Sequence, residues 1–181
     1  MAIVPDDKDW TWVLERPCPE CGFDAAELDP TTVGRRLRQA AADFRDALAR
    51  ADATRRPSAQ VWSPTEYGCH VRDVNRVFAT RVELMLDEDD PQFENWDQDR
   101  TAVEERYGEQ DPVEVADQLV RSTAAVADVY DAVPDDAWSR SGRRSNGSAF
   151  TVGTLAKYHL HDVVHHLHDV AAGSTPHPDG A

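Results

Sequence analysis

Five of the seven histidines in the chain fall within one stretch near its C-terminal end, Thr151–Gly173. The stretch is predicted to be a helix, because Thr151 can serve as its N-cap, Gly173 can follow its last turn, and no proline interrupts it. Imidazole is a common ligand of transition metals, so histidines that share one helix face can bind an ion. Histidines on an exposed face would only be solvated. The five are His159, His161, His165, His166 and His168.

Helical geometry separates two alternative pairs of ligands in this stretch. At about 100° per residue the apolar side chains form one arc, and Asp162 and His166 lie on its border. His161 and His165 lie opposite the arc, which would point them towards water or towards a second copy of the chain in a homodimer. The phase therefore favours Asp162 and His166, which are four residues apart, as the inward pair. The His161-x-x-x-His165 pair is the alternative.

A sixth histidine, His70, lies on the apolar face of another predicted helix. Ser63-Pro64-Thr65-Glu66 is a capping box with proline at the first helical position, and this helix extends to about Leu86. A lone histidine on an apolar face is more often a hydrogen-bonded core residue than a ligand. Together with Asp162 and His166, however, His70 would give three inward ligands, and three protein ligands plus an open position are typical of a catalytic metal. Nitrogen and oxygen ligands suit Zn²⁺, Ni²⁺, Mn²⁺ or Fe²⁺ alike.

The first thirty residues lack helical periodicity and contain a Cys18-x-x-Cys21 motif among the aromatic residues Trp10, Trp12 and Phe23. One such motif supplies two of the four ligands of a structural zinc site, and the chain has no second one. A packed turn with reduced thiols is favoured, with a shared metal or redox chemistry as alternatives. We expect this motif to be unnecessary for loading metal into the core, because the helices already offer three ligands.

Four stretches with apolar residues at helical spacing predict an all-α fold. Two are described above, and the others run over about 31–53 and 111–133. Four helices of about 20 residues joined by breakers are typical of a four-helix bundle, whose core can hold a metal between facing helices. The chain would then comprise a short irregular N-terminal extension at 1–30, the bundle at 31–173 and a disordered tail at 174–181.

Two polar stretches between these helices are expected to be irregular. The first is 134–148, and no strand-like alternation is visible there or elsewhere. The second, Asn95–Asp99, sets an aromatic side chain beside carboxylates. Such an arrangement could line a pocket, although a surface connection is favoured.

Composition narrows the kind of partner. The net charge of −15 argues against nucleic acid, because an acidic surface repels phosphates. No apolar run is long enough to span a bilayer, and the first residues lack the apolar segment of a signal peptide, which predicts a cytoplasmic protein. We therefore expect a small-molecule substrate and neither nucleic acid nor membrane as a partner.

The segment Trp62–Glu66, followed by His70 and by the histidine-rich fourth helix, resembles the DinB/YfiT-like metalloenzyme superfamily. The resemblance covers about 31–172 and implies a four-helix bundle with a three-ligand metal site. The usual fourth-helix pattern is His-x-x-x-His, but the maleylpyruvate isomerase branch has Glu-x-x-x-His-x-x-Asp. This chain has Asp162-x-x-x-His166-x-x-Asp169, which is close to the second form with aspartate in place of glutamate.

This resemblance implies an enzyme, since the superfamily includes mycothiol-dependent maleylpyruvate isomerases and bacterial thiol S-transferases. A divalent metal held by His70, Asp162 and His166 would act with a low-molecular-weight thiol such as mycothiol. The reaction would be S-transfer to a small electrophile or its isomerisation. Asp169 would orient a liganding histidine. The alternative is a non-catalytic metal-binding stress or regulatory protein, in which Cys18, Cys21 or a carboxylate closes the coordination sphere.

Overall fold

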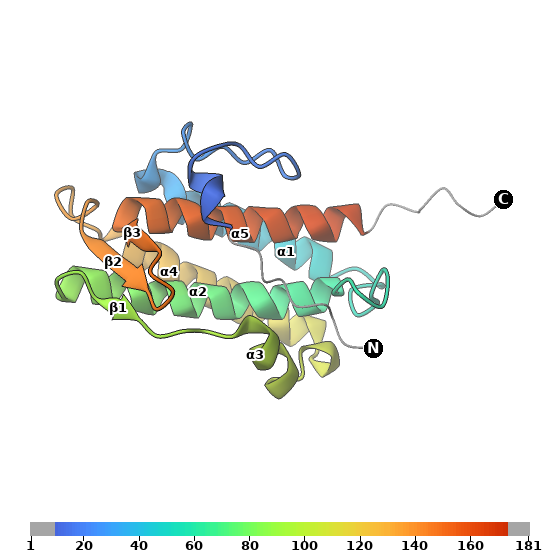
Figure 1. The fold of residues 1–181 in the computed structure, drawn as a ribbon. Coiled ribbons are helices and arrows are strands. Elements are labelled where there is room, and N and C mark those ends of the chain that lie inside the picture. The colour runs from blue at the N-terminus through green and yellow to red at the C-terminus, as the bar shows by residue number, and fades with distance from the viewer. Residues whose placement is uncertain (1–9, 174–181) are drawn as a thin grey trace.

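The computed structural model describes residues 10–173 of the chain. Within this part the fold is mainly helical, and four long helices lie side by side along a common direction (Figure 1). The four are α1 (Val33–Leu48), α2 (Pro64–Asp87), α4 (Pro112–Asp131) and α5 (Val152–Ala172). The predicted fold class, an all-α four-helix bundle, is confirmed. The predicted disordered tail at 174–181 lies outside the described residues.

Shorter elements join and flank the four helices. The described residues include one short α-helix, three 3₁₀ helices and three short strands, but no helix that combines the length and the apolarity needed to cross a bilayer. The elements are η1 (Thr11–Leu14), η2 (Pro30–Thr32), β1 (Gln92–Phe93), α3 (Gln98–Glu104), η3 (Tyr107–Glu109), β2 (Ser141–Arg144) and β3 (Ala149–Thr151).

Apolar side chains at three- and four-residue spacing form the core between the long helices. Helices α1 and α2 each pack against both α4 and α5, while the contact between α1 and α2 is smaller. Burial of one large apolar side chain contributes about 1.5–3 kcal/mol, so this core supplies most of the stability. Its fully buried members include Leu37, Phe44, Val74, Val82, Leu119, Val126, Leu155 and Leu160.

The first long helix is shorter than its apolar pattern predicted. It ends at Leu48 rather than near Ala53, and the intervening residues form turns. Ala53 is buried, but its carbonyl oxygen accepts hydrogen bonds from the Thr65 amide at 3.0 Å and the Thr65 hydroxyl at 2.9 Å. Ala53 therefore belongs to the connection between α1 and α2, and its carbonyl binds the first turn of α2.

The prediction of an irregular 134–148 stretch without strands was wrong in part. Strand β2 pairs in parallel with β1 and in antiparallel fashion with β3, which leads directly into α5. The strands are too short to show alternation. In addition, the buried position of β2 is Gly142, where a Cβ atom would lie 2.6 Å from the Phe93 ring and 2.8 Å from Met85. Close backbone packing thus replaces the apolar side chain that would have indicated a strand.

The start of α2, which precedes His70 by almost two turns, is fixed by the predicted capping box. The Ser63 hydroxyl accepts from the Glu66 amide at 3.3 Å, and Glu66 accepts from the Ser63 amide at 2.9 Å. The Arg56 Nε donates to Glu66 at 2.8 Å. Burial alone would raise the pKa of Glu66, but the hydrogen bonds from Arg56 and Ser63 outweigh it and hold this pKa below 4.5. The carboxylate is therefore charged in the folded protein at neutral pH.

We predict that Glu66→Ala lowers the free energy of unfolding by about 2–3 kcal/mol at neutral pH. The substitution removes one half of the capping box and leaves the Arg56 guanidinium without its charge partner. Chemical denaturation of both proteins measures the difference. Glu114→Ala is the matched control, because Glu114 occupies the same first-turn position of α4 after a proline but is exposed.

The pH dependence of this difference follows from the lowered pKa. A carboxylate whose folded-state pKa is depressed stabilises the fold above its unfolded pKa, and this stabilisation is lost as the pH falls through the folded-state value. The difference between wild type and Glu66→Ala should therefore be complete above about pH 5 and shrink below about pH 4.5. Equal losses in the two variants, or a difference that does not change with pH, would contradict the assignment.

Candidate metal centre

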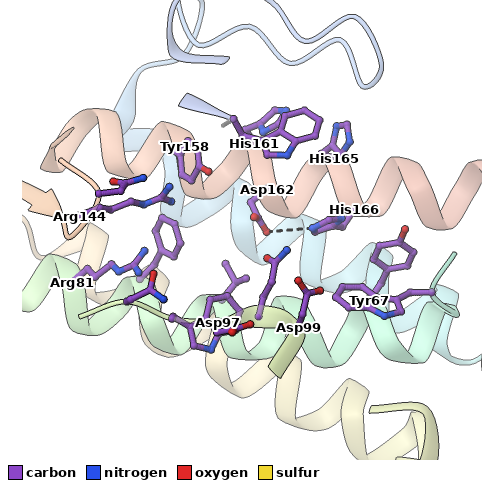
Figure 2. Close-up of a pocket in the computed structure, with 18 of the residues that line it drawn as sticks. Tyr67, Arg81, Asp97, Asp99, Arg144, Tyr158, His161, Asp162, His165 and His166 are labelled. Atoms are coloured by element: carbon purple, nitrogen blue, oxygen red, sulfur yellow. Dashed lines mark ion pairs between the residues drawn. The ribbon is translucent and has the colours of Figure 1, made fainter. Parts of the chain in front are cut away.

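The structure brings His70 of α2 together with Asp162 and His166 of α5. The His70 Nε2 lies 3.5 Å from the Asp162 Oδ1, and the His166 Nε2 lies 3.7 Å from the same oxygen. One ligand atom from each residue lies within 4.8 Å of the other two. Figure 2 shows Asp162 and His166 on the same side of α5, directed towards each other and towards α2. These three residues are the inward set that the sequence predicted, although their role as ligands remains a prediction.

Several polar atoms of this cluster are buried without a hydrogen-bond partner. They are both ring nitrogens of His70 and the Oδ1 of Asp162, since the 3.5 Å contact between these side chains does not form a hydrogen bond. Each unsatisfied buried group costs about 1–3 kcal/mol, so such groups normally have a partner. A divalent cation between the three side chains would give a partner to the Nε2 of His70 and to the Oδ1 of Asp162 at the same time. The donor set thus fits the metal that the superfamily resemblance implied.

The charge states of these side chains also suit a cation. Burial lowers the pKa of His70, which keeps the imidazole neutral and its lone pair available. Burial alone would raise the pKa of Asp162, but His70 and His166 outweigh it and hold this pKa well below its usual range. The neutral imidazole of His70, the imidazole of His166 and the carboxylate of Asp162 therefore converge on the site.

Asp169 holds the ring of His166 in place. The His166 Nδ1 lies 3.1 Å from the Asp169 Oδ2, which leaves Nε2 facing Asp162. A carboxylate on the far nitrogen of a metal-binding histidine fixes its tautomer and its ring orientation. The geometry fits the orienting role expected of Asp169.

The expectation that His161 and His165 point towards water or a second copy was wrong. Their exposed fractions are only 3% and 7%. The face of α5 that lies opposite the apolar arc is covered by the N-terminal extension, in which the rings of Trp10 and Phe23 lie 4.9 Å from His165 and 5.3 Å from His161. Periodicity could not reveal this cover, because the extension is irregular. The face needs no second copy of the chain to bury it.

Two further histidines of α5 lie outside the cluster. His159 is fully buried and bridges Tyr130 at 3.1 Å and the Asn75 side-chain oxygen at 3.0 Å. Burial lowers the pKa of His159 to about 3, so this ring is a neutral core residue. His168 is exposed. Of these two, only His168 fits the interpretation of a solvated histidine on an exposed helix face.

A cavity of about 460 Å³ adjoins the cluster, and Asp162 and His166 both lie in its wall. The favoured interpretation of Asn95–Asp99 as a mere surface connection was wrong, because these residues line the opposite side of the cavity (Figure 2). Two arginines, Arg81 and Arg144, also line it and were missed by the sequence analysis. Arg81 is one of several charged residues of α2 and Arg144 lies in the unpredicted strand β2, so no local pattern marked either as part of a site.

The cysteines of the extension do not approach the three-residue cluster as additional ligands. Cys18 is buried, and its Sγ lies 3.7 Å from the Nδ1 of His165. His165 belongs to the alternative pair of α5 histidines and not to the three-residue cluster. All three cysteines are reduced. Burial raises the pKa of Cys21 to about 11, so this sulfur lacks the lowered pKa of a redox-active thiolate.

Fold and site together define a helical-bundle protein with a candidate metal centre in its core. The chain belongs to the DinB superfamily, whose family model matches residues 9–170. The superfamily resemblance is thus confirmed, and the match includes the cysteine-containing extension that the resemblance had left out. No curated protein matches the chain.

One solved structure shows the same architecture. YfiT from Bacillus subtilis, described as a probable metal-dependent hydrolase with an unusual four-helix bundle topology, superposes with a TM-score of 0.73. The superposition covers 80% of this chain and 85% of YfiT, at 14% sequence identity. At this identity the likeness establishes the fold.

We predict that His70→Ala, Asp162→Ala and His166→Ala each remove one tightly bound divalent ion per chain. The helices should persist, because the apolar core rather than this site supplies most of the stability. Elemental analysis of the purified proteins and far-ultraviolet circular dichroism measure the two quantities. Asp169→Asn should instead weaken metal affinity by about 10–100-fold, because it removes only the orienting carboxylate.

His168→Ala is the matched control for this series. It removes an exposed imidazole from the same helix, where surface substitutions usually change stability by less than about 0.5 kcal/mol. Unchanged metal content in His70→Ala would contradict the site. Outright unfolding of that variant would instead make the metal a structural element of the bundle.

Proposed function

We propose that this chain is a metal-dependent enzyme that uses a low-molecular-weight thiol, mycothiol or a related compound, for S-transfer to a small electrophile or for its isomerisation. The observation that supports an enzyme is the position of the three-residue cluster in the wall of a cavity large enough for small molecules. The thiol is suggested by the pattern Asp162-x-x-x-His166-x-x-Asp169, which is close to that of the thiol-dependent isomerases.

His70, Asp162 and His166 would hold the divalent ion, which can be zinc, nickel, manganese or iron. A Lewis-acidic ion in this place lowers the pKa of a thiol, so that a thiolate is available at neutral pH. With three protein ligands the ion would keep an open position, and Asp162 and His166 both line the cavity from which a thiol could reach it. The aromatic rings of Trp62 and Trp96 flank the fully buried His70, at 5.4 Å and 5.6 Å between ring centroids, and both line the cavity.

The chemistry requires only a thiol and an electrophile. In S-transfer the sulfur forms a bond to the electrophilic carbon, the leaving group departs with its electron pair, and the thiol proton is released. In isomerisation the thiol adds across a double bond, the resulting single bond rotates, and elimination restores both the double bond and the thiol. Tyr67 lines the cavity beside His166, and burial raises the pKa of its phenol above the usual range. The hydroxyl therefore stays protonated at neutral pH and can donate a hydrogen bond to negative charge that develops on a substrate.

The two arginines of the cavity suggest that the substrate carries a carboxylate. The guanidinium of Arg81 lies 5.4 Å above the Phe78 ring, and that of Arg144 lies 4.8 Å from the Tyr158 ring. Neither guanidinium pairs with a carboxylate among the described residues. Burial and the neighbouring Arg144 charge lower the pKa of Arg81 to about 10, which still leaves it charged at neutral pH. An anionic substrate group placed between them would supply the missing partner.

Two other functions are weighed against this proposal. A non-catalytic protein would need a closed coordination sphere, and the cysteines expected to close it lie with His161 and His165 instead. A hydrolase is the second candidate, favoured by the description of YfiT, and would use the same three ligands without a thiol.

We predict that the metal-loaded protein converts electrophiles only when a thiol is present. Mycothiol with maleylpyruvate tests isomerisation, and mycothiol with chlorodinitrobenzene tests S-transfer, both followed by absorbance. His166→Ala should abolish the reaction, since it removes a ligand, whereas His168→Ala should retain it. Thiol-independent hydrolysis of a nitrophenyl ester that is lost in His166→Ala would overturn the thiol proposal in favour of the hydrolase.

A separate prediction concerns the arginines. Arg81→Gln and Arg144→Gln should each raise the KM for a carboxylate substrate by about 10–100-fold, because a hydrogen bond to a charged group is worth about 1.5–3 kcal/mol. The methyl ester of the same substrate should show little change. Arg143→Gln is the matched control, because Arg143 is exposed on the same strand and pairs with Asp90. Equal effects on acid and ester would contradict an anion subsite.

A further inference from the structure

A second cluster of potential metal ligands lies on the face of α5 that the N-terminal extension covers. It contains two thiols and two imidazoles, from Cys18, Cys21, His161 and His165, and one ligand atom of each lies within 4.8 Å of the others. The cluster shares no ligand with the His70, Asp162 and His166 cluster. The two clusters lie side by side because α5 carries His161 and His165 next to Asp162 and His166.

The cluster consists of a cysteine pair and a histidine pair, and the spacing within each pair is that of a structural zinc site. Such sites combine Cys-x₂₋₄-Cys with His-x₃₋₅-His, and this chain offers Cys18-x-x-Cys21 and His161-x-x-x-His165. A tetrahedral zinc ion with Zn–S of about 2.3 Å and Zn–N of about 2.1 Å separates a sulfur from a nitrogen by about 3.6 Å. The Cys18 Sγ lies 3.7 Å from the His165 Nδ1. The apposed atoms are therefore already near the separation that one shared ion requires.

The surroundings of the cluster also indicate a ligand. The Nε2 of His161 is buried without a hydrogen-bond partner, and His161 itself is only 3% exposed. The backbone around the cysteines forms a tight turn, in which the Cys18 amide donates to the Phe23 carbonyl at 2.8 Å. Gly22 adopts a φ of 72° there, a left-handed conformation that favours glycine. The turn directs both sulfurs towards α5.

The second nitrogen of His165 has carboxylate neighbours. Its Nε2 lies 3.6 Å from the Glu20 Oε2 and 3.9 Å from the Asp169 Oδ1. A carboxylate near the far nitrogen of a liganding histidine favours the tautomer that leaves Nδ1 free to bind metal. The arrangement on His165 thus resembles the one that Asp169 makes with His166.

We propose that Cys18, Cys21, His161 and His165 form a closed structural zinc site that fastens the N-terminal extension to α5. Four protein ligands leave no open position, which distinguishes this site from the three-ligand site beside the cavity. The thiols lose their protons to solvent when the ion binds. The loaded chain would then hold two ions with different tasks. The inference stands independently of the thiol chemistry proposed above.

The test begins with the wild-type protein, purified with zinc. X-ray absorption should show zinc–sulfur scattering at about 2.3 Å, and elemental analysis should give two zinc ions per chain. The Cys18→Ser/Cys21→Ser variant should hold one ion and no sulfur-bound zinc. His70→Ala should also hold one ion but retain the sulfur scattering, which shows that the two sites are separate and that the sulfur comes from the chain. Cys69→Ala, which removes the remaining cysteine, should hold two ions.

The fastening role has its own readout. In Cys18→Ser/Cys21→Ser, a glutamate-specific protease should cut after the exposed Glu20 faster than in wild type, and the melting temperature should fall by about 5 °C or more. Absence of sulfur scattering from wild-type zinc protein would overturn the proposal even if the variant fails to fold. Loss of the same single ion in both variants would overturn it as well, since one shared site would then exist. Neither result bears on whether the enzyme uses a thiol.

Discussion

The burial of polar atoms between α2 and α5 is the constraint on which the rest of the structure depends. A bundle core normally excludes unpaired ring nitrogens and carboxylate oxygens, because each costs free energy that apolar packing must offset. Here His70 and Asp162 place such atoms in a bundle whose core otherwise consists of packed apolar side chains. The capping box at Ser63 and the carboxylate of Asp169 restrict the positions from which these atoms approach one another. The fold thus contains a cluster of unsatisfied polar atoms whose free-energy cost the surrounding apolar packing must offset.

Helix α5 differs from an ordinary amphipathic helix because it is buried on more than one face. Its apolar side contributes to the core, its Asp162 side faces α2 and the cavity, and its His161 side lies under the extension. A single amphipathic stripe would leave one face to solvent. The bundle and the extension together cover nearly all sides of α5, which explains why so many of its histidines are buried. Only a minority, such as His168, remains exposed.

The sequence was sufficient to predict what depends on local periodicity. The four helices, the start of α2 and the inward direction of Asp162 and His166 all follow from spacing and capping residues. It was insufficient where contacts join distant segments. Cys18 and His165 are 147 positions apart in the sequence, although their side chains are in contact. Neither the cysteine pair nor the histidine pair supplies four ligands alone. The cavity could not be predicted either. Arg144 lines it from strand β2, which no apolar pattern marked because its buried residue is Gly142.

The N-terminal extension forms part of the cavity wall through Trp10, which stacks on Trp12 and lies beside His161. The cavity is therefore shaped in part by a segment that is separate from α2 and α5, the two helices that carry the candidate ligands. This segment also packs into the bundle, because Val13 and Leu28 belong to the same buried apolar cluster as the long helices. A change in the extension would therefore alter the enclosure of the cavity and the packing of the bundle together, so that both properties are coupled through one irregular segment.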